Sequence, residues 1–476
     1  MVVDTKNLIM NTELRQTITT EMAWQYRVIP VESVGVWLEF LTDQAEEETG
    51  TVNELSILLG KEIRFLKVDK DRLTSLLLMY YPRSVSTRQK ISVKVGSDDF
   101  VFQLIREAKA LGSSDIHMEP YEKNSRVRIR IDGQMVERYN IPKSEYPGIL
   151  NRIKIMGHLD ISEKRLPQDG RIYFSSDQSK FDIRVSVLPT LYGEKVVMRI
   201  LSNDASSLEL EKMGFSENDL HHYTEAIRKP NGIILISGPT GSGKTTTLYA
   251  TLKRLNLPTK NILTIEDPVE YTLEGINQVQ LKEDIGLDFT KTLKTFLRQD
   301  PDIIMVGEIR DVSTAQMAIR AALTGHLVLS TIHTNSAWGI ISRLIDMGVP
   351  AYMVANTINL AVAQRLVRVL CEDCKTRVPF DPKVLPISFK VSGQPEYHFR
   401  RCGCEKCFYT GYKGRRAIYE VIPVDGELKE MIKNVDMDIT GFVKKNHIKL
   451  IADQAFDLVY NGVTSVDEVY NLLFLD

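Results

Sequence analysis

The sequence has no long apolar run and no secretory signal, and both absences restrict where the protein works. No apolar stretch among the 476 residues approaches the ~20 residues that a membrane-spanning helix needs. The N-terminal stretch carries Asp4, Lys6 and Glu13 and has no apolar segment of the kind that a signal peptide needs. We therefore expect a cytoplasmic location, with any association to a membrane made through a partner protein.

An excess of charge of either sign is also missing. Lys and Arg together number 60 and Asp and Glu number 62, so the formal net charge is −2. This balance argues against a strongly basic nucleic-acid binder and against a highly charged disordered chain, although it does not exclude a local basic face. Apolar residues make up 43% of the chain, which is the proportion found in ordinary globular proteins.

Cysteine is scarce and unevenly placed. Four of the 5 cysteines form two Cys-x-x-Cys pairs, Cys371 with Cys374 and Cys404 with Cys407. A disulfide framework does not usually occupy one short window of a long chain, whereas four thiolates suit a closed, structural zinc site. The pattern predicts Zn²⁺ held by these four residues, with reduced thiols without metal as the alternative. Cys402 is near enough to compete as a ligand but lies outside the paired spacing, so we expect it to be free.

The texture of the sequence divides the chain into five regions. Residues 1–95 carry no chemical motif and predict a small, mixed N-terminal domain. Residues 97–205 predict an α+β domain, and residues 206–365, where short β-rich runs alternate with helical patterns, predict a parallel α/β sheet. Residues 366–415 hold the cysteines, and residues 416–476 predict a helical C-terminal subdomain.

Within the α+β region, apolar residues alternate with arginines over residues 126–131. This alternation predicts a half-buried strand whose arginines lie on a solvated face. Asp132-Gly133 follows directly and predicts a hairpin turn. Asp169-Gly170 carries the same signal and predicts a second turn.

The segment GPTGSGKT (238–245) matches the phosphate-binding loop pattern in full. Residues 233–236 before it predict a buried strand and leucines at helical spacing after it predict a helix, which disfavours a chance glycine-rich turn. Glycines let backbone N–H groups surround phosphate oxygens, and the helix N-terminus favours negative charge. Lys244 would neutralise phosphate charge, and the Thr245 hydroxyl would ligate Mg²⁺. The residues predicted to bind ATP are Gly238, Pro239, Thr240, Gly241, Ser242, Gly243, Lys244, Thr245 and Thr246.

Two further predicted strands end in acidic residues. Residues 262–265 lead to Glu266, which can polarise the water that attacks the γ-phosphate, or is a solvated loop acid. Residues 303–306 lead to Glu308 in the arrangement of a Walker B acid, where it is a metal ligand, a water positioner or both. Arg310, close behind it, is either a charge sensor or a member of a structural ion pair.

A fourth predicted strand, residues 327–332, is bracketed by His326 and His333. A lone histidine is usually a core or surface residue. Two histidines at the ends of one strand, beside three strands that carry site residues, favour a functional role instead. Imidazole can hydrogen-bond the γ-phosphate or relay its presence.

Taken together, these motifs resemble those of the type II secretion and type IV pilus assembly ATPase family. The matching segments are GPTGSGKTT (238–246), TIEDPVEY (264–271), RQDPDIIMVGEIRD (298–311) and TGHLVLSTIHTN (324–335). SDIHMEP (114–120) and RLPQDGR (165–171) resemble the second N-terminal domain of that family. The resemblance covers about residues 97–476.

The resemblance implies a fold and site residues. It implies a RecA-like P-loop ATPase domain of the α/β class, preceded by a PAS-like α+β domain and a small N-terminal domain, and followed by a zinc-knuckle and helical region. Glu266 matches the catalytic glutamate of the aspartate box, and Glu308 matches the Walker B acid. The histidine box corresponds to His326 and His333.

Two arginines gain a role from the resemblance alone. Arg171 and Arg184 match the arginines that the second N-terminal domain presents to the nucleotide. Their role would be that of arginine fingers, which stabilise negative charge on the transferring phosphoryl group.

The resemblance also implies a function and partners. It implies an ATP-hydrolysing motor that forms a homohexamer, acts on an inner-membrane platform protein through its N-terminal domain, and moves pilin-like subunits indirectly. The cysteine pairs favour an assembly or secretion motor over a retraction motor, which typically lacks them. A nucleic-acid translocase is disfavoured by the near-neutral charge, so no nucleic-acid partner is expected. The intact nucleotide-site residues disfavour a scaffold that only binds nucleotide.

Overall fold

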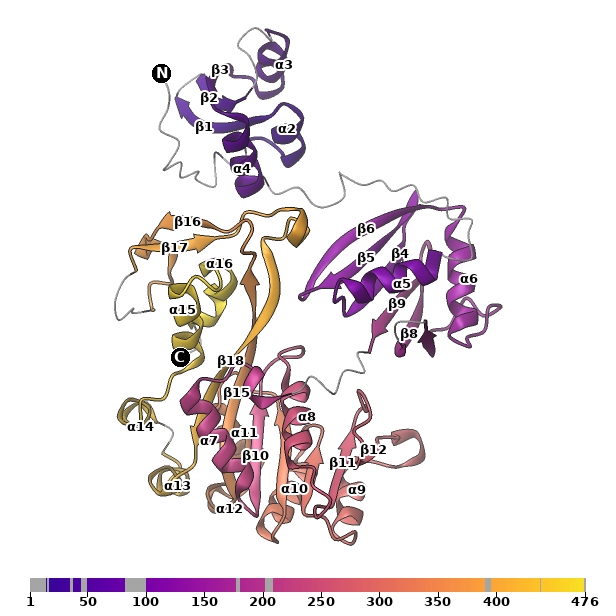
Figure 1. Ribbon diagram of the computed structural model, residues 1–476, viewed down its shortest axis with the longest axis vertical. Helices are drawn as coiled ribbons and strands as arrows, with labels where there is room; N and C mark the ends of the chain where they lie inside the picture. The colour runs from indigo at the N-terminus through magenta and orange to yellow at the C-terminus, as the bar shows by residue number, and fades with distance from the viewer. Residues whose placement is uncertain are drawn as a thin grey trace.

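The computed structural model describes residues 14, 17–34, 37–43, 49–81, 100–176, 180–201, 209–389, 395–436 and 438–474. These residues form four sheets, three of them with helices packed on them (Figure 1). The expected domain boundaries near residues 96 and 205 fall outside the described ranges. None of the described helices combines the length and the apolar character needed to cross a bilayer.

The first unit, indigo in Figure 1, is a three-stranded sheet covered by short helices. Strand β2 pairs antiparallel with β1 and parallel with β3. Leu38 and Phe40 of β2 are buried in one cluster with Trp24, Leu55 and Leu77, which come from three different helices. The elements are α2 (Thr20–Gln25), β1 (Val28–Val34), β2 (Trp37–Thr42), α3 (Thr49–Leu59), β3 (Glu62–Lys67) and α4 (Lys70–Tyr80).

The second unit is a six-stranded antiparallel sheet in the order β6-β5-β4-β9-β8-β7. The expected half-buried strand is β5, and the expected hairpin turn follows it, with Asp132 and Gly133 both at positive φ. Alternate strand residues pack with helices α5 and α6 in one core. The elements are α5 (Phe100–Ala110), β4 (Asp115–Pro120), β5 (Asn124–Ile131), β6 (Gln134–Pro142), α6 (Tyr146–Met156), β7 (Gln168–Ser175), β8 (Lys180–Thr190) and β9 (Gly193–Ile200).

The second turn expected in this unit is wrong. Asp169 and Gly170 lie inside strand β7, where Gly170 pairs with Val185 of β8. A Cβ placed at Gly170 would lie 2.4 Å from the carbonyl oxygen of Gly157, which closes helix α6. A glycine is needed at position 170 because two backbones approach closely there. In the sequence, a glycine that serves this purpose looks the same as a glycine in a turn.

The third unit is built on a seven-stranded sheet in the order β12-β11-β13-β14-β10-β15-β18. All neighbouring strands are parallel except β15 and β18, which are antiparallel. The predicted parallel α/β sheet is therefore present, and it continues past residue 365 through the end of β15 and into β18. The strands are β10 (Gly232–Ser237), β11 (Ile262–Glu266), β12 (Asn277–Gln280), β13 (Ile303–Val306), β14 (Leu327–Ile332), β15 (Ile358–Leu370) and β18 (Tyr412–Pro423).

Helices cover both faces of this sheet. Ile233 and Leu235 of β10 belong to one buried cluster, whereas Ile234 and Ile236 belong to another, so the alternating side chains of one strand fill two cores. One core includes α9, α10, α11, α12 and the C-terminal helices, and the other includes α7 and α8. The helices are α7 (Glu217–Arg228), α8 (Lys244–Leu255), α9 (Phe289–Phe296), α10 (Val312–Leu323), α11 (Trp338–Asp346) and α12 (Ala351–Thr357).

The C-terminal region packs against the same sheet. The two-stranded sheet of β16 (Thr376–Pro379) and β17 (Tyr397–Arg400) lies between β15 and β18 in the sequence. The tail forms α13 (Gly426–Lys433), α14 (Thr440–Lys445), α15 (Ile451–Tyr460) and α16 (Val466–Val469). Short 3₁₀ helices occur at Leu210–Lys212, Glu283–Ile285, Pro382–Val384, Glu405–Cys407 and Tyr470–Phe474.

Candidate active site

The glycine-rich loop joins the carboxyl end of β10 to the start of α8. Gly238, Gly241 and Gly243 all have positive φ, at 146°, 81° and 89°, which side chains other than glycine rarely adopt. A Cβ at Gly238 would also lie 2.4 Å from the carbonyl oxygen of Gln364. The hydroxyl oxygen of Ser242 is buried and has no hydrogen-bond partner among the described residues. The loop therefore leaves a polar group ready for a ligand at a helix N-terminus, where anions bind well.

Lys244 is the first residue of α8 and is only 9% exposed. Its ammonium nitrogen Nζ donates hydrogen bonds to the carbonyl oxygens of Gly238 and Pro239, at 2.8 and 3.1 Å. Burial lowers the pKa of Lys244, and the carboxylate of Glu308 opposes that shift. An anion bound in the loop would stabilise the charged form of this buried lysine.

Glu266 ends strand β11 and is 3% exposed, so the solvated loop acid considered for it is excluded. Its carboxylate accepts hydrogen bonds from the hydroxyls of Tyr249 and Thr264, the latter at 2.6 Å, and from the amide of Gln278 at 3.1 Å. Glu270, which sequence reasoning gave no role, lies four residues further on and lines the same cavity. Glu266 is therefore held rigidly, whereas Glu270 is more open to solvent.

Glu308 follows β13 and Gly307. A Cβ at Gly307 would lie 3.3 Å from the Cα atom of Glu266, so the glycine allows the two acid-bearing strand ends to approach closely. The Glu308 carboxylate contacts Arg310, and Nε2 of His333 lies 3.4 Å from it. Arg310 is thus held in an ion pair, which was one of the two roles considered for it.

The two histidines lie at opposite edges of the sheet. His333 follows β14 and lines the cavity with Glu308. His326 precedes β14, and its Nδ1 lies 2.8 Å from the carbonyl oxygen of Ala321. Strand β14 has six residues and is therefore about 20 Å long. Of these two histidines, His333 is thus near the phosphate loop and His326 is at the far end of the strand.

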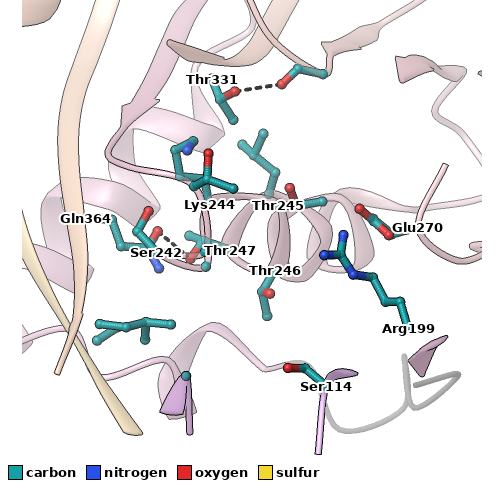
Figure 2. Close-up of a pocket in the computed structure, with 18 of the residues that line it drawn as sticks. Ser114, Arg199, Ser242, Lys244, Thr245, Thr246, Thr247, Glu270, Thr331 and Gln364 are labelled. Atoms are coloured by element: carbon teal, nitrogen blue, oxygen red, sulfur yellow. Dashed lines mark hydrogen bonds between the residues drawn. The ribbon is translucent and has the colours of Figure 1, made fainter. Parts of the chain in front are cut away.

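One cavity of about 1210 Å³ joins the second and third units. The ATPase sheet contributes the phosphate loop, both strand-end acids and His333, while the second unit contributes Ser114, His117 and Arg199. Figure 2 labels Ser114 and Arg199 together with the loop residues Ser242, Lys244 and Thr245. Figure 2 shows the guanidinium of Arg199 and the carboxylate of Glu270 facing one another beside the start of α8. The volume exceeds the ~300–1,000 Å³ typical of small-molecule sites, so a nucleotide fits between the units.

A row of cross-strand neighbours lies on the second unit. Arg171 pairs with Arg184, Arg184 with Arg199, Arg199 with Asp115, and Asp115 with Arg130. Directly opposite residues in a sheet share one face, so four arginines and one aspartate form a continuous row. We call these five residues the arginine row.

The members of the arginine row differ in their contacts. Arg171 is held by Asp182 at 2.7 Å, and Arg184 donates to the carbonyl oxygen of Val269 at 2.6 Å. Neither is among the residues that line the cavity, whereas Arg199 and Arg130 both are. Sequence reasoning missed Arg199 because its place in the row follows from strand register, which no local motif encodes.

The solvated face expected for the arginines of β5 is also wrong. Arg126 and Arg128 bind the buried carboxylate of Glu119, at 2.8 and 2.7 Å. Arg130 lies 3.3 Å from Asp115. Buried acids on the neighbouring strand β4 therefore pair with this whole set of arginines.

The four paired cysteines form one cluster. Their sulfur atoms all lie within 4.8 Å of one another, and the Cys371–Cys404 and Cys404–Cys407 sulfurs are 3.8 and 3.7 Å apart. Four thiolates at the ~2.3 Å zinc–sulfur distance of a tetrahedral site have sulfurs about 3.8 Å apart. Cys402 contacts the Thr376 hydroxyl and stands outside the cluster. The donor set and spacing fit a tetrahedral metal ion.

A mostly parallel sheet with a phosphate loop after one of its inner strands and acids at the ends of two further strands defines a RecA-like P-loop ATPase. Residues 97–471 match the model of the type II/IV secretion system protein family. The chain belongs to this family and is an ATP-hydrolysing motor of the assembly and secretion type.

Similar proteins support this assignment. The type IV pilus assembly ATPase PilB of Myxococcus xanthus is 41% identical over 464 residues, which span 91% of this chain and 81% of that protein. The type II secretion system protein E of Pseudomonas aeruginosa is 46% identical over 369 residues, 77% of this chain and 73% of that one. The Legionella pneumophila ATPase DotB shares the fold, with a TM-score of 0.59 and 21% identity over 79% of this chain and 95% of that one.

The cavity predicts that Arg199 contributes to nucleotide binding. Arg199→Ala removes a cation that faces the cavity, so ATP should bind about 10- to 150-fold more weakly, as for the loss of one charged hydrogen bond. Isothermal titration calorimetry with ATP and Mg²⁺ measures the change. Arg126→Ala is the matched control, because Arg126 lies on the same sheet but pairs with Glu119 away from the cavity. Equal affinities for the two variants would contradict the prediction.

Proposed function

We propose that the chain uses ATP hydrolysis to drive pilin-like subunits out of the inner membrane, in a type IV pilus or a type II secretion system. The observation that carries the proposal is the cavity that joins the phosphate loop to the arginine row of a separate unit. Nucleotide bound there would draw the two units together, and loss of phosphate would release them. Such closure and release can do mechanical work on a partner.

The donor atoms around the loop support binding of ATP with Mg²⁺. Thr245 and Glu308 offer the oxygen ligands that Mg²⁺ prefers, and both line the cavity. The bound ion would neutralise charge that develops on the phosphates. Lys244 and the backbone N–H groups of residues 240–246 would hold the phosphate oxygens.

Glu266 is proposed as the general base that takes a proton from the attacking water. Hydrogen bonds from Tyr249, Thr264 and Gln278 fix its carboxylate, and positioned bases are efficient ones. His333, beside Glu308, would report the presence of the γ-phosphate. His326 lies at the other end of β14, outside the cavity. To sense the γ-phosphate, it would have to contact nucleotide bound to another chain.

Arg171 and Arg184 are proposed as arginine fingers together with Arg199. In this arrangement Asp182 holds Arg171, and the carbonyl oxygen of Val269 holds Arg184. For either arginine to reach the phosphates, the second unit must therefore move relative to the ATPase sheet. The arginine row has one cation on each of several adjacent strands of the second unit. Movement of this unit relative to the phosphate loop would therefore bring a different arginine to the phosphates.

We also propose the finer division of the chain. Residues 1–95 would dock the platform protein, residues 97–205 would be the PAS-like domain, residues 206–365 the ATPase core, residues 366–415 a zinc knuckle, and residues 416–476 a helical subdomain. Strands β15 and β18 cross the boundaries at 365 and 415, so they complete the sheet of the ATPase core from the two regions that follow it. With this division, the chain would form a homohexamer on the cytoplasmic side of the inner membrane, held there by its partner proteins. The cysteine cluster favours an assembly motor over a retraction motor.

The proposal is tested by the ATPase rate of the full chain. We expect the rate to rise with vesicles that contain a candidate inner-membrane platform protein and to stay unchanged with DNA. Empty vesicles are the control. Stimulation by DNA and none by any platform protein would contradict the proposal and favour the nucleic-acid translocase.

The role of Glu266 predicts a variant that binds but does not turn over. Glu266→Gln keeps the shape and most hydrogen bonds, so ATP should bind with near wild-type affinity while hydrolysis slows by about 10²–10⁴-fold, as for loss of a general base. Single-turnover assays measure the chemical step. Glu270→Gln is the matched comparison on the same segment. If Glu270→Gln alone causes the large loss, Glu270 is the base and our assignment is wrong.

The cysteine cluster predicts zinc bound at about one ion per chain. Cys404→Ser should lose the ion and lower the melting temperature, because the metal joins two distant segments, whereas Cys402→Ser should keep it. Elemental analysis of the purified protein and a thermal melt measure both. A wild-type chain without zinc, or a Cys404→Ser variant that keeps it, would contradict the site.

A further inference from the structure

Glu420 is a carboxylate buried on β18, between the ATPase sheet and the C-terminal helices. The residue is 3% exposed. Its Oε1 accepts a hydrogen bond from the N–H of Ala337 at 2.7 Å, and its Oε2 accepts one from the N–H of Ile451 at 3.4 Å. Ala337 is the N-cap of α11, and Ile451 is the first residue of α15. One side chain therefore closes the N-termini of two helices.

Each helix caps a different N–H group from its own sequence. At the start of α11 the Ser336 hydroxyl oxygen accepts from the N–H of Gly339 at 3.1 Å, and at the start of α15 the Asp453 carboxylate accepts from the N–H of Leu450 at 3.2 Å. The N–H groups of Ala337 and Ile451 donate to Glu420 instead. The first N–H groups of a helix have no partner within the helix, and a carboxylate there also gains from the helix dipole. Burial raises the pKa of Glu420, and the backbone hydrogen bonds and the charge of Arg365 oppose that rise. One N–H group at each of the two helix starts therefore depends on the same buried carboxylate.

The start of α11 is continuous with the nucleotide site. Helix α11 follows residues 333–337, which begin at His333 in the cavity. Within this segment, Arg365 donates to the carbonyl oxygen of Asn335 at 2.6 Å, and the Ser237 hydroxyl donates to that of Ser336 at 3.3 Å. Ser237 directly precedes the phosphate loop. Residues 333–337 are thus tied to the loop at one end and to Glu420 at the other.

The start of α15 is continuous with the C-terminal subdomain. Gln454 of α15 donates to the backbone carbonyl of Tyr419, the neighbour of Glu420 on β18, and to Asp219 at 3.0 Å. Helix α15 also packs with α16 and the last 3₁₀ helix in one core. Neither Glu420 nor Ile451 lines the nucleotide cavity. A change at the phosphate loop can therefore reach α15 through Glu420 without any direct contact between α15 and nucleotide.

We propose that Glu420 is a positioning residue that couples the nucleotide site to the C-terminal helical subdomain. When His333 and its segment adjust to the γ-phosphate, the start of α11 moves, and the shared carboxylate moves the start of α15 with it. Moving one helix alone would leave a buried N–H without an acceptor, which is costly. The inference rests on the proposed function, because it requires ATP at the phosphate loop.

Glu420→Gln tests the coupling. A glutamine side chain keeps one acceptor oxygen and replaces the other with an NH₂ group, so one of the two helix starts loses its partner. Glu468→Gln is the matched control. Glu468 is another partly buried carboxylate of the C-terminal tail, and it fastens α16 to β15 through Arg368, with 3.1 Å between Oε1 and the Arg368 N–H. Its contacts do not include residues 333–337.

The experiment measures amide hydrogen exchange at residues 335–345 and 451–460, in the full chain, with and without a non-hydrolysable ATP analogue. We expect the analogue to slow exchange at both segments in the wild type and in Glu468→Gln. In Glu420→Gln the response at residues 451–460 should be lost. The same variant should show kcat reduced about 2- to 30-fold with a smaller change in KM, the range for residues that carry coupling.

Several results would overturn the inference. These are a wild-type chain that binds the analogue without a response at residues 451–460, a Glu420→Gln variant that keeps the response, or equal losses in Glu420→Gln and Glu468→Gln. If Glu420→Gln does not fold, Glu420→Asp, which keeps the charge but is one methylene shorter, should lose the same response. A wild-type chain that does not bind the analogue at all would instead contradict the proposed function.

Discussion

Parallel register at one edge of the ATPase sheet is the constraint on which the whole site depends. Strands β11, β13, β14 and β10 pair residue for residue, so their carboxyl ends meet at the same edge. That edge gathers a buried ammonium, Lys244, and two carboxylates, Glu266 and Glu308, from segments far apart in the sequence. Burial disfavours each charge taken alone. Lys244 and a bound magnesium ion would together offset the negative charge of the two carboxylates and of the phosphates.

The second unit adds cations whose partners a triphosphate can replace. In this arrangement Arg171 binds Asp182, Arg184 contacts Glu270, and Arg199 binds Asp115. Each arginine is thus neutralised when no phosphate is near, which agrees with a chain whose formal net charge is only −2. Exchange of a carboxylate for a phosphate would give an arginine a new anionic partner and would free the carboxylate. In the proposed function, nucleotide would drive the closure of the two units through such an exchange, and loss of phosphate would reverse it.

The sequence predicts those parts of the site whose residues are contiguous, and fails where strand register decides. The phosphate loop, Glu308 and the cysteine pairs lie within short motifs whose spacing carries the chemistry. Arg199 enters the site because it pairs with Arg184 and Asp115 across strands, and no local pattern contains that pairing. His326 and His333 both flank strand β14, but they lie at its opposite ends, so only His333 is near the phosphate loop. Gly170 has the signal of a turn because close backbone packing and turns need the same residue.

The antiparallel pair of β15 and β18 links the remaining features. Its end at Leu370 and Tyr412 adjoins the cysteine cluster, and the N–H of Cys371 donates to the carbonyl oxygen of Gly411 at 3.0 Å. Further along, the same pair places Glu420 opposite Ala363, beside the residues that contact the phosphate loop. The cluster therefore lies at one end of this strand pair. An irregularity in register between Arg368 and Leu370 separates that end from the rest of the ladder. The cysteine cluster and the residues beside the phosphate loop thus lie on either side of this irregularity, on the same two strands.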